Sequence, residues 1–276
     1  MMMELLNIFA AGTLALCAVP ASATTFVDGE FFSFSQTTWG SKPPIGYPNT
    51  ILLATNPHGG TNFDFVYPLG VTLGLQPLQP SFRRVIFDTA DDAITFMPQP
   101  GPPAAFDNNL LNPGGPGQST SSGVFGGEVL ALFLNIDFND AGFLPHPIGV
   151  TYGDLIIGGY DGGLAGLDGL TIRQFRDIAN TAIGGGSTAF SIPDLSAQLR
   201  LINGAFEGGF HTIYADQHLS VSAITPPPPA VPEPATWSLL LIGFGIVGGA
   251  VRRHHAAIGA TVAWDERQGQ GLRQSR

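Results

Sequence analysis

The chain has 276 residues, with 11 Lys and Arg against 21 Asp and Glu, so its formal net charge is −10. A nucleic-acid binder needs a basic face that displaces counterions, and this balance excludes nucleic acid as a direct partner. Hydrophobic residues make up 44% of the chain, which is enough for a buried core, while 37 Gly and 23 Pro predict many turns.

Residues 1–23 are typical of a secretory signal peptide. An apolar stretch leads to Pro20, which ends any helix, and Ala21 and Ala23 are the small residues that a signal peptidase reads. Cleavage after Ala23 would make Thr24 the first residue of the mature chain. We therefore expect an exported protein whose first partner is signal peptidase.

Cys17 is the only cysteine of the chain, and it lies inside this predicted signal peptide. After cleavage the protein would have no disulfide, no thiolate metal site and no cysteine nucleophile. Its stability would then come from packing or from bound ions.

The first part of the predicted body, residues 24–97, is expected to be rich in strands. Short runs of β-branched and aromatic residues alternate there with Gly, Pro, Asn and Asp, which is the pattern of strands joined by turns. The predicted strands are residues 31–34, 50–53, 63–67, 71–75, 85–87 and 94–97. Residues 98–123 are dominated by Pro, Gly, Asn and Ser and predict a long loop or linker.

The second part, residues 124–225, predicts an α+β region. Every second residue from Leu130 to Phe138 is apolar, and Asn135 and Asp137 fall between them, which favours a strand, with a helix as the alternative for the first turns. Two helices are expected. The first is bounded by Thr171 and Gly184, and the second has Pro193 in its first turn and Gly204 near its end.

Residues 219–223 alternate again and predict a final strand. The fold class expected is therefore a β-dominated α+β body, with a strand-rich first half and two helices in the second half. The pattern leaves open whether this body forms one domain or two.

The sequence motifs of the body give little indication of catalysis or metal binding. It lacks the Gly-x-Ser-x-Gly turn of serine hydrolases and the His-Glu-x-x-His pair of zinc proteases. Its histidines are interpreted as loop or strand-end residues, with the last two on opposite faces of a strand: His58, His146, His211 and His218. We assign no catalytic residue and no metal ligand.

Carboxylates are abundant in the body, with 17 Asp and Glu against 6 Lys and Arg, a net charge of −11. Paired carboxylates could serve glycoside hydrolysis, so a hydrolase is the alternative to a non-catalytic body, but the sequence nominates no pair. Arg83 and Arg84 are expected to form surface pairs with nearby acids: Asp88, Asp91 and Asp92.

Calcium is the one cofactor that the arrangement of the acidic residues suggests. Asp154, Asp161 and Asp168 recur every seven residues through a glycine-rich segment, and Asp137, Asn139 and Asp140 form a second oxygen-rich cluster. Hard cations prefer several such oxygens at turns. The other interpretation is a set of Asp–Gly turns, and we expect no cofactor.

The C-terminal part begins with four prolines, Pro226 to Pro229, which predict a stiff extended spacer. From Trp237 to Val251 the 15 residues carry no charge. As a helix they would span about 22 Å, against a hydrocarbon core of roughly 30 Å. Arg252 and Arg253 follow as a basic stop that favours a cytoplasmic C-terminus. We predict a single transmembrane helix here.

Residues 231–255 resemble a PEP-CTERM sorting signal of the PEPxxWA subclass, a segment also called an ice-binding protein C-terminal domain. The resemblance is carried, in this order, by Pro232, Glu233, Pro234, Trp237, the stretch Gly243-Phe244-Gly245, Arg252 and Arg253. Ser238 stands where the subclass has alanine, and residues 256–276 form an atypical tail after the basic cluster.

The resemblance implies recognition by an exosortase, a membrane-embedded cysteine transpeptidase or protease of Gram-negative bacteria that make exopolysaccharide. It implies that Pro232, Glu233 and Pro234 are the recognition element, and that the span and its arginines hold the precursor in the inner membrane. The protein would then pass to the cell surface or the biofilm matrix. We expect a structural or carbohydrate-contacting body there, with exopolysaccharide as its partner.

The domain organisation expected is thus a series of six segments. These are a signal peptide at 1–23, a β-rich region at 24–97, a loop or linker at 98–123, an α+β region at 124–225, the spacer, motif, transmembrane helix and stop at 226–255, and the tail at 256–276.

Overall fold

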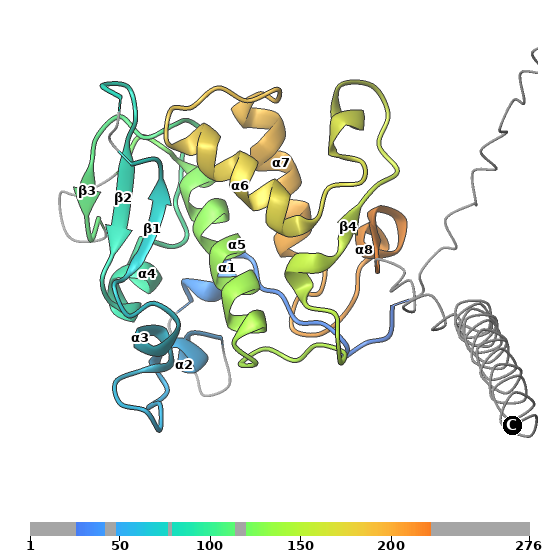
Figure 1. The fold of residues 1–276 in the computed structure, drawn as a ribbon, viewed down its shortest axis with the longest axis horizontal. Helices are drawn as coiled ribbons and strands as arrows, with labels where there is room; N and C mark the ends of the chain where they lie inside the picture. The colour runs from blue at the N-terminus through green and yellow to red at the C-terminus, as the bar shows by residue number, and fades with distance from the viewer. Residues whose placement is uncertain (1–25, 42–47, 77–78, 114–119, 222–276) are drawn as a thin grey trace, which may run out of the picture. The chain divides into compact units, whose positions relative to one another are not determined.

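The computed structural model describes residues 26–41, 48–76, 79–113 and 120–221 (Figure 1). All of them belong to one compact unit that ends at Ala223. The predicted signal peptide, transmembrane helix, sorting signal and tail lie outside the described residues. Within the described ranges, no helix is long and apolar enough to span a bilayer. The transmembrane helix predicted at 237–251 therefore stays a prediction.

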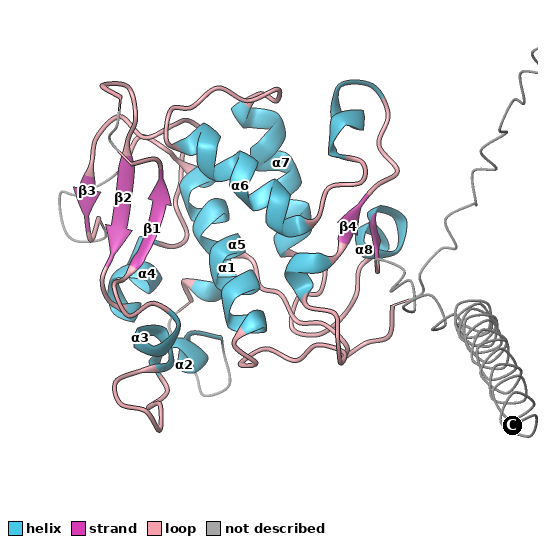
Figure 2. Ribbon diagram, viewed as in Figure 1, coloured by secondary structure: helices cyan, strands magenta, loops and turns pink. Residues whose placement is uncertain are grey.

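Among the described residues, helices outweigh strands, and loops join them, as Figure 2 shows. The α-helices are α1 Gln36–Trp39, α2 Pro48–Leu53, α3 Asn62–Val66, α4 Ala90–Phe96, α5 Val124–Asp140, α6 Ile172–Ile183, α7 Ile192–Asn203 and α8 Ile213–His218. Two 3₁₀ helices are η1 Tyr152–Asp154 and η2 Gly162–Leu167. The strands are short: β1 Val71–Gly74, β2 Arg84–Phe87, β3 Leu110–Leu111, β4 Ile156–Ile157 and β5 Leu219–Ser220. The mixed α and β composition is confirmed, and the predicted dominance of strands is wrong.

The long helix α5 runs through the middle of the described body, beside α6 and α7 (Figure 1). The strand predicted at 130–138 is wrong, because these residues are part of α5. Most of the helix is buried, including positions on every side of it. A helix that is apolar all round shows no helical period, so apolar residues at every second position say nothing about its geometry.

Three other predicted strands are short helices: residues 50–53 lie in α2, 63–67 largely in α3, and 94–97 largely in α4. Side-chain caps fix two of them. Thr61 accepts from the backbone N–H of Asp64, whose carboxylate accepts from the Thr61 N–H. Thr89 caps α4 by accepting from the backbone N–H of Asp92. These caps satisfy backbone donors that a strand would have to pair elsewhere. Residues 31–34 form only an isolated bridge, between Ser33 and Glu207.

The strands predicted at 71–75 and 85–87 are confirmed as β1 and β2, which pair antiparallel with Val71 opposite Phe87. β3, which lies in the predicted loop 98–123, adds to β2 in parallel. β4 and β5 form a separate antiparallel pair, and β5 confirms the start of the strand predicted at 219–223.

Both predicted helices of the second half are confirmed, as α6 and α7. Thr171 caps α6 in a capping box with Gln174, and Gly184 is its C-cap. Ser191 caps α7, with Pro193 in the first turn and Gly204 as the C-cap. The apolar faces of both helices pack into one hydrophobic core that also takes residues of β1, β2, α4 and α5. The regions 24–97 and 124–225 therefore share a core.

Candidate functional site

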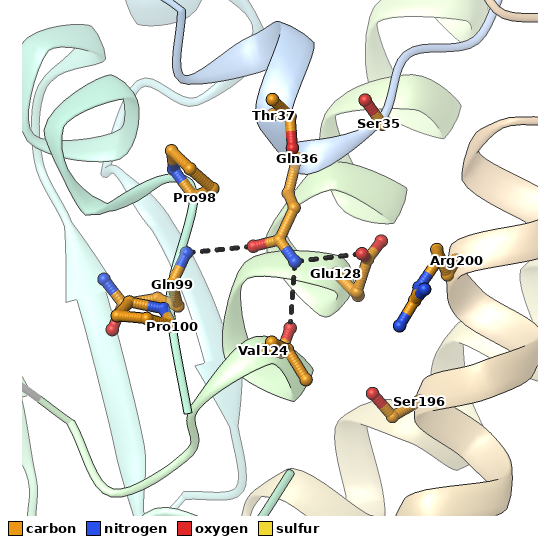
Figure 3. A pocket seen from close by; sticks show the side chains of 10 residues that line it. All are labelled: Ser35, Gln36, Thr37, Pro98, Gln99, Pro100, Val124, Glu128, Ser196 and Arg200. Carbon is orange, nitrogen blue, oxygen red and sulfur yellow. Dashed lines mark hydrogen bonds between the residues drawn. The ribbon is translucent and has the colours of Figure 1, made fainter. Parts of the chain in front are cut away.

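A pocket of about 510 Å³ opens where α1, the segment 98–100, the first turn of α5 and α7 meet (Figure 3). Its described lining combines polar, apolar and charged residues: Ser35, Gln36, Thr37, Pro98, Gln99, Pro100, Val124, Glu128, Ser196 and Arg200. Pockets of this size accommodate small organic ligands.

Two glycines allow α1 to reach the pocket. A Cβ at Gly127 of α5 would overlap the side-chain oxygen of Gln36, and a Cβ at Gly40 would overlap the backbone carbonyl of Met97. Because neither position carries a side chain, α1 packs directly against α5 and against the segment that begins at Pro98. Ser35 starts α1 by accepting from the N–H of Thr38.

The Gln36 side chain joins three segments at the pocket floor. Its Oε1 accepts from the backbone N–H of Gln99 at 3.0 Å. Its Nε2 donates to Glu128 Oε1 at 2.9 Å and to the Val124 carbonyl at 3.4 Å, as the dashed lines in Figure 3 show. The amide group is thus fixed in one orientation.

Glu128 is the buried carboxylate of the pocket, with 4% of the residue exposed. Its second oxygen, Oε2, accepts from Asn203 Nδ2 at 2.8 Å. Burial raises the pKa of the Glu128 carboxyl above its ordinary value, although the hydrogen bonds from Asn203 and Gln36 and the charge of Arg200 act in the opposite direction.

A buried amide network supports this carboxylate from behind. Asn203 Oδ1 accepts from Asn135 Nδ2 at 3.1 Å, and Asn135 Oδ1 accepts from Trp39 Nε1 at 3.0 Å and from the Phe34 N–H at 2.9 Å. This network was not predicted from the sequence. Its signal was the presence of polar residues, Glu128 and Asn135, within the apolar run that forms α5.

Arg200 lies on α7, one turn after Ser196, and faces Glu128 of α5 in the pocket. It is exposed, and among the described residues it makes no hydrogen bond or ion pair. Figure 3 shows its guanidinium group between the side chains of Glu128 and Ser196. The pocket therefore combines a fixed acceptor with a donor that has no partner among the described residues, and their formal charges cancel.

None of the four histidines of the described body lines this pocket, and each makes different contacts. His58 stacks on Phe65, His146 contacts the Pro147 carbonyl, and His218 contacts the Gly158 carbonyl. His211 lies 2.7 Å from Asp28 and 3.6 Å from Asp216. His211 precedes α8 and His218 ends it, so their predicted placement on two faces of a strand is wrong. In the described ranges no three His, Cys, Asp or Glu side chains form a group that could hold a metal ion.

All but Asp161 of the oxygen-rich side chains that suggested calcium have partners within the described body. Arg176 pairs with Asp137 at 3.1 Å, and Arg173 pairs with Asp140 at 2.7 Å and Asp154 at 3.5 Å. Asp168 accepts from the Tyr160 N–H, and Asn139 accepts from the Tyr152 N–H. Asp161 is exposed at the start of η2.

The surface pairs predicted for Arg83 and Arg84 are not formed. Arg83 donates to backbone carbonyls, including that of Asp107, and Arg84 donates to Gln76. The acids expected as their partners, Asp91 and Asp92, lie in the first turn of α4, where they complement the helix dipole.

The predicted sorting residues and the predicted cleavage site at Ala21 and Ala23 lie outside the described residues. Comparisons of the chain with curated proteins and with solved structures found no match. A comparison with protein families matched residues 230–253 to the PEP-CTERM protein-sorting motif. The match spans Pro232, Glu233, Pro234 and Trp237 and ends at Arg253, which confirms the resemblance. The chain thus carries a PEP-CTERM protein-sorting motif, which indicates an exported protein processed by exosortase, a membrane enzyme.

Proposed function

We propose that the processed protein is delivered to the cell surface or the biofilm matrix of an exopolysaccharide-producing Gram-negative bacterium, where its body contacts carbohydrate without catalysis. Signal peptidase would first remove residues 1–23, and the inner membrane would hold the precursor until exosortase acts. Pro232, Glu233 and Pro234 would be the recognition element, and Arg252 and Arg253 the membrane stop. The sorting motif supports this sequence of events.

The pocket is the observation that carries the proposal for the body. Its described lining supplies hydroxyl and amide groups, a carboxylate, a guanidinium and the apolar rings of Pro98 and Pro100. Sugars present hydroxyl groups, each a donor and an acceptor, together with apolar C–H faces. This lining matches both features of a sugar ring.

A secreted hydrolase that acts on matrix polymer is the second candidate. A buried carboxyl with a raised pKa, in a pocket, is the property of a general acid, and Glu128 has it. Glycoside hydrolysis normally needs a second carboxylate facing the first. Among the described residues that line the pocket, Glu128 is the sole carboxylate, and both its oxygens already accept amide hydrogens. These facts favour binding over hydrolysis.

The experiment incubates the purified full chain with the exopolysaccharide of its own host for a day. Co-sedimentation and polymer length are followed together. Retention on the polymer at unchanged length supports the proposal. Progressive shortening that Glu128→Gln abolishes would establish the hydrolase instead, and no retention with no shortening would refute both.

A further inference from the structure

We propose that this pocket binds a neutral sugar through two neighbouring hydroxyl groups, one donating to the Glu128 carboxylate and the other accepting from the Arg200 guanidinium. The inference rests on the proposed carbohydrate contact and specifies the class of ligand.

The acceptor half of the site is preformed. A carboxylate offers roughly four lone-pair positions, and the described residues use two of them at Glu128, one from Gln36 and one from Asn203. The remaining capacity belongs to a group that lines the pocket and is 4% exposed. A hydroxyl donor placed there would offset the cost of burying this carboxylate.

The donor half is Arg200. A guanidinium has five N–H donors and no acceptor, and those of Arg200 have no partner among the described residues. Ser196, on the same helix, adds a hydroxyl to this wall. Because each sugar hydroxyl both donates and accepts, two adjacent hydroxyls can satisfy Glu128 and Arg200 at once.

The charges of the pocket and of the body favour a neutral sugar over an acidic one. A ligand carboxylate could pair with Arg200, but it would bring a like charge next to Glu128 and could not donate to it. The body also carries a net charge of −11, which repels anionic polymers at a distance. Pro98 and Pro100, across the pocket from Arg200 and Ser196 in Figure 3, give the ring an apolar wall.

The test measures binding of three methyl hexosides to the full chain by saturation-transfer NMR. Methyl α-glucoside, α-galactoside and α-mannoside together present trans and cis vicinal diols. The hexoside that binds is then compared with its product after periodate cleavage of the diol and borohydride reduction, and with its uronate. We expect the cleaved and reduced product to bind about tenfold more weakly or worse, as for the loss of a hydrogen bond to a charged group. We expect the uronate to bind more weakly as well, because its carboxylate brings a like charge next to Glu128.

Arg200→Gln is the main variant, since Arg200 is exposed and makes no ion pair with any described residue, so its replacement does not endanger folding. We expect it to weaken hexoside binding about tenfold, and Arg200→Lys to weaken it less, because the charge is kept and the planar fork is lost. Arg84→Gln makes the same charge change outside the pocket, where Arg84 contacts Gln76, and should leave binding unchanged.

Equal binding to the wild type and Arg200→Gln, or tighter binding of the uronate, would overturn the inference. So would the absence of binding by all three hexosides. If the protein still co-sediments with exopolysaccharide in those cases, the proposed carbohydrate contact stands and only the ligand class is wrong.

Discussion

Asn203 donates twice to Glu128, to the backbone carbonyl at 2.9 Å and to the side-chain carboxylate at 2.8 Å. The two hydrogen bonds join the end of α7 to the first turns of α5. Asn203 is fully buried, so both hydrogen bonds are shielded from bulk solvent. The wall of the pocket that carries Arg200 is therefore held in place by the same residue that orients Glu128.

Replacing Asn203 by aspartate should destabilise the protein strongly. The change turns a donor into an acceptor and sets two buried carboxylates face to face, at a cost of about 3 kcal/mol or more in the free energy of unfolding. Urea unfolding measures it. Asn108→Asp is the matched control, because Asn108 is exposed and makes no hydrogen bond among the described residues. Equal effects of the two substitutions would contradict the role given to Asn203.

The buried Glu128 carboxyl determines in which direction the free energy of unfolding changes with pH. Its pKa in the folded protein lies above the unfolded value of 4.5. As the pH rises from there through the folded pKa, the unfolded state releases the proton first, so the carboxyl's contribution to stability is lost. The free energy of unfolding of the wild type minus that of Glu128→Gln should therefore fall as the pH is raised above 4.5. A difference that is constant or rises would show that the carboxyl is not penalised by burial.

Gly40→Ala tests the close approach of α1 to the segment 98–100. The added methyl group would overlap the Met97 carbonyl, so we expect a loss of about 1–3 kcal/mol in the free energy of unfolding. Gly158→Ala is the control, because a Cβ there meets nothing within 4 Å. It should change stability by less than about 0.5 kcal/mol. If both variants unfold at the same urea concentration, the two segments are not packed as described.

Chelation should leave the protein unaffected. Asp137, Asp140 and Asp154 are already paired with Arg176 and Arg173, so their carboxylates are engaged without a cation. We expect the same melting temperature for the full chain with and without excess EDTA. A lower melting temperature in EDTA would instead support the calcium site that the spacing of the acids suggested.

The helices α6 and α7 could be predicted because their capping residues and apolar faces are local sequence patterns. In α6, for example, Thr171 and Gln174 form the cap and are three residues apart. Similar caps precede α3 and α4, at Thr61 and Thr89, but the β-branched and aromatic residues that follow pointed to strands. Tertiary packing decided the outcome, since such residues fit a buried helix face as well as a sheet. For α5, burial on all sides removed the helical period itself.

The pocket could not be predicted from the sequence. Gln36 and Glu128 meet across 92 residues of chain, and their contact depends on the missing side chain of Gly127. No local pattern encodes an approach of this kind. The sorting motif could be predicted, because all its parts lie within residues 230–253.

The most direct test of the account replaces Pro232, Glu233 and Pro234 by alanine and follows the protein in its host by cell fractionation. The account predicts that this precursor stays in the membrane fraction at its unprocessed size. Replacing Pro226, Pro227 and Pro228 by alanine, outside the matched residues, should leave processing and release intact. Release of the first variant at normal mature size would contradict the claim that exosortase recognises this motif.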